Sequence, residues 1–203
     1  MAVIHRATLV PSKLELLGTW LKSRLAEPSD GAVELLGAYR FDDPDGEVGI
    51  EGHLIRWGTE IVHVPVTYRG SPLAGAEHWL IGTMEHSVLG RRWVYDAMAD
   101  PVARRALLGA LGGTVEQAAW EVWDGDRLVE TRQPTVRVRR EGSTGRAPVE
   151  AGQVTVEEAD SVVRVVLGTA ELRVARVLGR RLPGEARLIG DWAGGSADLA
   201  SVG

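Results

Sequence analysis

Cysteine is absent from the 203 residues. The chain therefore has neither a disulfide framework nor a thiolate metal site. It also lacks any apolar run approaching the roughly 18 residues of a membrane-spanning helix. The opening residues, Met1–Arg6, lack the charged and then apolar order of a secretion signal. These absences predict a cytoplasmic protein with no membrane partner.

Lysine is scarce too, because only Lys13 and Lys22 accompany 21 arginines. The net charge is −5, and residues 131–203 carry 11 arginines against 9 acidic residues. Binding to nucleic acid requires clustered cations that neutralise several phosphates. So slight a positive excess predicts no nucleic-acid partner.

Two helices are marked by their ends. Ser12 and Glu15 have the spacing of a capping box at a helix start. Leucines at helical spacing then follow, at Leu14, Leu17, Leu21 and Leu25. Asp100–Pro101 is a favoured start for a second helix, and Gly112–Gly113 is expected to stop it.

Much of the remaining chain alternates between apolar and polar residues. Residues 32–69 predict half-buried antiparallel strands, with apolar side chains facing the core and polar ones facing water. Pro65 has no N–H to donate, so its strand is expected at a sheet edge or a bulge. Residues 76–96 predict two further strands. The fold class is therefore α+β, with an antiparallel sheet and two flanking helices.

The chain divides near residue 130. Residues 1–130 contain both predicted helices, whereas residues 131–203 predict a strand-rich C-terminal extension packed on them. Residues 141–152 have the flexible composition of a linker. Small and polar residues from about 194 onward predict a frayed tail.

No complete catalytic motif is present. The chain lacks the G-x-S-x-G elbow, and its glycine-rich stretches lack the spacing that cradles phosphates. No histidine begins the catalytic loop of a protein kinase, in which an aspartate lies close behind it. The five histidines are followed by Arg6, Leu54, Val64, Trp79 and Ser87. We therefore predict no enzyme activity, no catalytic residue, no metal and no cofactor.

Two Glu-His pairs form a polar cluster in the sequence, Glu77–His78 and Glu85–His86. On one continuous strand the two imidazoles would lie about 26 Å apart, too far to share an ion. Only a hairpin at Gly82–Thr83 would bring them together. Histidines on the surface of a sheet are the alternative interpretation.

The densest polar segment is Arg91–Asp96, in which Arg91, Arg92, Trp93, Tyr95 and Asp96 surround one valine. Arginine and aromatic residues are enriched at protein interfaces, so this segment is a candidate interface, for self-association or for another protein. The alternative is an amphipathic strand whose arginines pair with nearby acids. Seven tryptophans against one phenylalanine also suggest a surface for sugar rings, although single tryptophans belong more often to a core.

Several longer strings resemble the N-terminal cap domain of actinobacterial maltokinases and related glucosamine kinases. They lie at 1–9, 11–17, 42–51, 63–73 and 75–96, beginning Met-Ala-Val-Ile-His-Arg and ending Arg-Arg-Trp-Val-Tyr-Asp. The likeness covers about residues 1–130. It implies a strongly curved, cystatin-like antiparallel sheet, which in those kinases sits on the N-lobe and supplies no catalytic residue.

The resemblance implies a non-catalytic interaction or regulatory protein linked to maltose 1-phosphate and α-glucan metabolism. Its partner would be another protein of that metabolism or a second copy of the chain. The alternative is a small-ligand module that binds a sugar on the concave sheet through its tryptophans.

Overall fold

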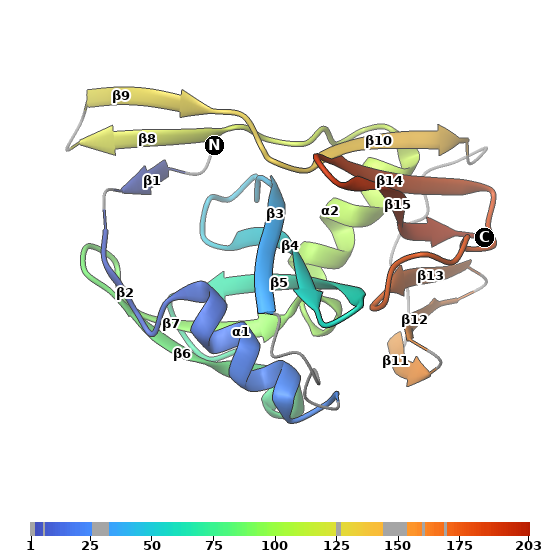
Figure 1. Cartoon of the computed structure of the whole chain (residues 1–203), viewed down its shortest axis with the longest axis horizontal. Helices are drawn as coiled ribbons and strands as arrows, with labels where there is room; N and C mark the ends of the chain where they lie inside the picture. The colour runs from blue at the N-terminus through green and yellow to red at the C-terminus, as the bar shows by residue number, and fades with distance from the viewer. Residues whose placement is uncertain are drawn as a thin grey trace.

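The computed structural model describes residues 3–5, 7–25, 33–124, 127–143, 154–159, 161–168 and 170–203 (Figure 1). Most of the predicted linker at 141–152 lies outside these residues. The two α-helices are α1 (Lys13–Lys22) and α2 (Pro101–Gly112), and the two 3-10 helices are Glu77–Trp79 and Ala97–Ala99. All other described elements are strands, so the predicted α+β class with an antiparallel sheet is confirmed. The cystatin-like topology stays a prediction.

The described strands form three sheets. The first is strongly curled (Figure 1). Its order is β2 (Leu9–Val10), β6 (Leu80–His86), β7 (Gly90–Asp96), β5 (Glu60–Arg69), β4 (Gly49–Trp57), β3 (Val33–Phe41). The second has the order β10 (Arg137–Gly142), β14 (Ala186–Trp192), β15 (Gly195–Val202), β13 (Ala170–Ala175), β12 (Val162–Leu167), β11 (Val154–Ala159). The third is β1 (Val3–His5), β8 (Trp120–Asp124) and β9 (Arg127–Arg132), in which β1 and β8 run parallel.

Helix α1 begins where the capping box predicts. The Ser12 hydroxyl accepts from the Glu15 N–H, and the Glu15 carboxylate accepts from the Ser12 N–H. Leu17 and Leu21 are buried against the apolar residues of β4, β5 and β7. The predicted apolar stripe of α1 is therefore confirmed as the face that covers one side of the curled sheet.

Replacing Leu17 by alanine should lower the free energy of unfolding by about 2–5 kcal/mol, because the side chain is fully buried and the cavity would not collapse completely. Urea unfolding of both proteins measures the difference. Leu25→Ala, at the half-exposed end of the same stripe, is the matched control and should cost less. Equal losses would show that α1 does not bury Leu17.

Helix α2 lies between the curled sheet and the second sheet (Figure 1). Asp100 caps it by accepting from the Val102 N–H, and Gly113 ends it in the left-handed region at φ +77°. Its buried residues share one apolar core with β3, β4, β12, β13, β14 and β15. Residues from both sides of position 130 therefore contribute to a single core.

Strands β4 and β5 are buried on both faces, so the predicted half-buried pattern is wrong for them. Glu51, His53, His63 and Thr67 were expected to face water, but each is less than 9% exposed. Their apolar neighbours pack against α1 on one face and against the shared core on the other. Two covered faces leave no solvent side for the polar residues, which must find partners inside the protein.

Pro65 lies in β5, which is an inner strand and not the predicted edge. Its neighbour β7 pairs with β5 only from Val66 to Arg69. Pro65 therefore meets no ladder partner on that side, and its missing N–H breaks no hydrogen bond there.

The predicted frayed tail is also wrong. Residues 195–202 form β15, which lies between β13 and β14 inside the second sheet. Leu199, Ala200 and Val202 are buried. The small residues of β15 fit between strands β13 and β14 and against the core. In the sequence alone, the same small residues indicate a flexible end.

Candidate functional site

The predicted Glu-His cluster does not come together as a metal site. Glu77 and His78 lie exposed in a 3-10 helix that precedes β6, and the hairpin turn falls at 87–89 and not at Gly82–Thr83. Glu85 accepts from Arg91 at 2.7 Å on the surface. His86 Nδ1 accepts the Val88 and Leu89 N–H groups of the turn. Among the described residues no group of three or more metal-binding side chains exists.

The predicted interface segment splits into an outer and an inner part. Arg91 is exposed, and Arg92 and Trp93 are half-buried. Tyr95 and Asp96, by contrast, are buried. The Tyr95 hydroxyl accepts from the Leu73 N–H at 3.0 Å. These last two residues therefore hold the fold and offer no surface to a partner.

A junction between the curled sheet and the second sheet forms along the first half of β5. The stretch of β5 that β7 leaves open is filled by residues 176–178. The His63 N–H donates to the Arg176 carbonyl at 2.7 Å, and the Leu178 N–H donates to the Ile61 carbonyl at 2.8 Å. A short segment that follows β13 is thus paired with the part of β5 that β7 leaves open.

The buried Arg176 side chain also stabilises this junction. Its guanidinium forms a buried ion pair with Asp96, and its Nε lies 3.3 Å from Glu158. Glu158 also accepts from Arg24 at 2.8 Å. Asp96 in turn accepts from the Met98 N–H, so both carboxylate oxygens are used.

His63 lies beside this ion pair in a fully buried position. Its Nδ1 donates to the Ala175 carbonyl at 2.9 Å, so its Nε2 accepts from the Tyr39 hydroxyl at 2.8 Å. Burial lowers the pKa of His63 to about 3, and the positive charge of Arg176 acts in the same direction. The imidazole is therefore neutral at physiological pH and works as a fixed hydrogen-bonding link.

The stability of the fold should fall between pH 7 and pH 5. In the unfolded chain His63 binds a proton near pH 6.5, whereas in the folded protein it resists protonation down to about pH 3. Because only the unfolded chain gains this proton, the free energy of unfolding is at its full value above pH 6.5 and falls as the pH is lowered. The loss due to His63 is about 2 kcal/mol at pH 5. Urea unfolding at both pH values tests this. In the variant His63→Gln the free energy of unfolding should depend less on pH, whether or not the variant is itself less stable. An equally strong pH dependence would contradict a buried, neutral His63.

A second buried polar cluster lies under the start of α1. Glu51 accepts from Lys13 at 2.6 Å and lies 3.3 Å from His53, whose Nε2 is 3.1 Å from the Tyr68 hydroxyl. Burial alone would raise the pKa of Glu51, but Lys13 and His53 together bring it below its ordinary value. Burial raises the pKa of Tyr68, and Glu51 adds to this rise. The ion pair of Lys13 with Glu51 therefore ties α1 to β4.

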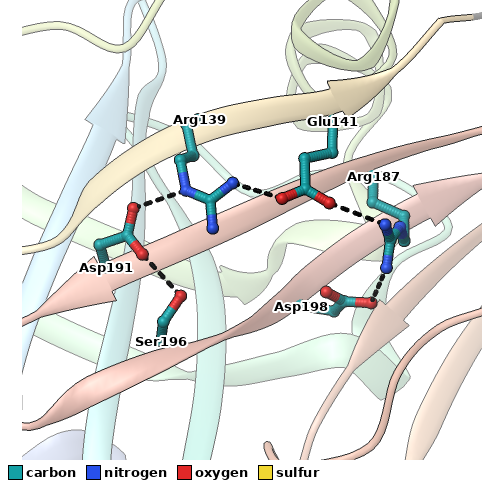
Figure 2. A network of polar contacts seen from close by, with 6 residues as sticks. All are labelled: Arg139, Glu141, Arg187, Asp191, Ser196 and Asp198. Atoms are coloured by element: carbon teal, nitrogen blue, oxygen red, sulfur yellow. Dashed lines mark hydrogen bonds and ion pairs between the residues drawn. The ribbon is translucent and has the colours of Figure 1, made fainter.

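An arginine groove lies on the second sheet, on strands β10, β14 and β15. Arg139 donates to Asp191 at 2.9 Å and to Glu141 at 2.6 Å (Figure 2). Arg187 donates to Glu141 at 2.8 Å and lies 3.3 Å from Asp198. Two adjoining hollows, of about 480 and 290 Å³, open over these residues and the loop at 179–185.

Sequence reasoning missed both the junction and the groove. Asp96 and Arg176 are 80 residues apart, and Glu141, Arg187 and Asp198 come from three strands. The arginine excess of residues 131–203 is the one signal that points toward the groove. No spacing in the chain marks the junction.

The first half of the described chain is thus a curled antiparallel sheet that carries helix α1 on one face. Residues 18–100 match the family model of the maltokinase N-terminal cap domain. The resemblance drawn from the sequence is confirmed over this segment, which is similar to the maltokinase cap. No curated protein matches the chain.

No helix of the described residues is both long and apolar enough to cross a membrane.

Proposed function

We propose that this chain acts without catalysis, as a cap-type module that binds another protein of α-glucan or maltose 1-phosphate metabolism. The observation that carries this proposal is the use of the cap-like segment as a packing surface. Its strand β5 holds residues 176–178 by main-chain hydrogen bonds, and its buried Asp96 holds Arg176. The polar residues of the segment thus serve packing, as they would in a docking module.

The surface we propose for the partner is the tip of the β6–β7 hairpin. Val88 and Leu89 in the turn are 54% and 44% exposed, and Val10 on the neighbouring β2 is 63% exposed. Mutual hydrogen bonds between Thr8 and Ser87 hold β2 and the turn side by side. Arg91 lies next to this tip. An apolar centre with arginine at its rim is typical of a protein interface.

Leu89→Glu should abolish binding of the partner, because it places a charge in the apolar centre of the tip. Leu128→Glu is the matched control, since Leu128 is 43% exposed on β9 and lies outside the tip. Cross-linking with mass spectrometry, followed by titration with the purified α-glucan enzyme that it identifies, measures the binding. Equal binding by both variants and the parent would contradict the proposed surface. Sedimentation of the same proteins distinguishes self-association.

Catalysis is tested directly by incubating the protein with ATP, Mg²⁺ and maltose or glucosamine and following phosphorus by NMR. We expect no sugar phosphate to form. Sustained turnover that survives repurification would contradict a non-catalytic role.

The alternative, a sugar site built from tryptophans, gains no support from their positions. Trp20 and Trp57 are buried in the core under α1, and the other five tryptophans are half-buried. The residues that line the two hollows of the arginine groove include no tryptophan. Titration with maltose, followed by tryptophan fluorescence, should leave the spectrum unchanged; saturable quenching would favour the alternative.

A further inference from the structure

The loop at 179–185 is held firmly over the second sheet. The Leu182 N–H donates to Asp198 Oδ2 at 2.8 Å, and the Ser201 hydroxyl donates to the Pro183 carbonyl at 2.7 Å. Gly184 lies in the left-handed region at φ +149°, and a Cβ there would lie 2.6 Å from the Val202 carbonyl oxygen. The loop backbone therefore has a fixed shape, and a ligand would have to order only its side chains.

Two arginines of this loop have no partner within the described structure. Arg180 and Arg181 are exposed, and neither forms a hydrogen bond or an ion pair with another described residue. Both line the hollow of about 290 Å³ together with Arg187, and Arg181 also lines the hollow of about 480 Å³. No described carboxylate therefore competes with an external anion for a hydrogen bond from either guanidinium group.

Arginines and carboxylates are equal in number in the groove, in a chain whose net charge is −5. Four arginines line it: Arg139, Arg180, Arg181 and Arg187. Three carboxylates line it as well, Glu141, Glu185 and Asp198, and Asp191, which pairs with Arg139, is a fourth. The two arginines without a carboxylate partner among the described residues lie on the loop, because Arg139 and Arg187 are already paired (Figure 2).

Glu141 remains ionised beside these cations. The hydrogen bond from Arg139 lowers its pKa, and the charges of Arg187 and Arg181 add to this effect. An ionised carboxylate accepts hydrogen bonds and donates none. The groove therefore offers the guanidinium groups of Arg180 and Arg181 as donors, and the Glu141 carboxylate as an acceptor for a hydroxyl of the ligand.

We propose that the arginine groove binds a phosphate group carried by a small polyhydroxylated molecule. Arg180 and Arg181 hold the phosphate oxygens, and Glu141 accepts from a hydroxyl of the carrier. The planar guanidinium group matches phosphate by paired N–H···O bonds, which are stronger than neutral hydrogen bonds. A hollow of about 480 Å³ has the size of small-molecule sites in proteins.

The test compares three probes, inorganic phosphate, glucose 6-phosphate and glucose, by calorimetric titration of the full chain at low ionic strength. We expect glucose 6-phosphate to bind more tightly than phosphate, glucose to show no binding, and added salt to weaken both phosphate probes. The double variant Arg180→Ala, Arg181→Ala should weaken glucose 6-phosphate binding about tenfold or more, because two charge-assisted contacts are lost. Arg105→Ala removes an exposed arginine of α2 and is the matched control.

A variant that is expected to bind more tightly makes the test independent of any loss of folding, because unfolding can only weaken binding. Glu185→Gln removes a carboxylate that lines the groove and should tighten phosphate binding about two- to fivefold. Absence of binding by either phosphate probe, equal binding by glucose, or unchanged affinity in the double arginine variant would overturn the proposal. Equal affinity for phosphate and glucose 6-phosphate would overturn the role of Glu141.

Discussion

Replacing Arg176 by methionine should lower the free energy of unfolding by about 3–5 kcal/mol. The change leaves Asp96 fully buried without its cation, and an uncompensated buried charge is far more costly than the loss of a surface ion pair. The same change removes the link between Glu158 and the interior. Urea unfolding monitored by tryptophan fluorescence measures the loss, because Trp20 lies 5.9 Å from the Arg176 guanidinium.

Two further variants separate the buried charge from the lost packing. The double variant Asp96→Asn, Arg176→Met removes both charges and should be less destabilised than Arg176→Met alone. Arg91→Met removes the partner of Glu85 from a pair that is mostly exposed, and it should cost less than about 1 kcal/mol. If Arg176→Met cost no more than Arg91→Met, the buried pair would not hold the junction.

Gly52→Ala should be comparably severe, with a loss of about 3–5 kcal/mol. Gly52 stands opposite Tyr39 across β4 and β3, and an added Cβ would overlap the tyrosine ring. The ring cannot give way freely, because it is buried and its hydroxyl is hydrogen-bonded to His63. Overpacking and the loss of that buried hydrogen bond therefore add together.

Gly18→Ala is the matched control for this substitution. Gly18 lies inside α1, and a Cβ there meets no atom within 4 Å. The same chemical change should therefore stabilise the protein, by about 0.5–1 kcal/mol, because alanine favours a helix more than glycine does. Thermal unfolding of the two variants should shift in opposite directions. A shift of the same sign in both would show that the Tyr39 ring moves aside without cost.

Local signals predicted the helices because their causes lie within a few residues. The capping box at Ser12 and Glu15 and the Asp100–Pro101 start are short-range hydrogen bonds and backbone preferences, which the sequence displays directly. The hairpin strands were also predictable, since alternation and turn residues mark them. The likeness to the maltokinase cap was predictable for another reason, namely that long ordered strings are specific.

The burial of polar residues was not predictable from local patterns. His63 is polar and alternates with valines, which normally indicates a solvent-facing position. Its partners are Tyr39, which is 24 residues away, and the Ala175 carbonyl, which is 112 residues away. No local window contains both, so only the assembled sheets reveal that the position is buried. The ion pair of Asp96 with Arg176 and the arginine groove could not be predicted from the sequence for the same reason.

The position of β15 has a consequence for the order of folding. A ribosome makes residues 195–202 after all the other strands of the second sheet, yet this strand separates β13 from β14. Until it emerges, β10 and β14 form one pair and β11, β12 and β13 another group, each with an unpaired inner edge. Such edges invite pairing with other chains. The second sheet therefore closes from its centre only after residues 195–202 are made, and a nascent chain stalled before residue 195 would expose the edges of both groups to neighbouring chains.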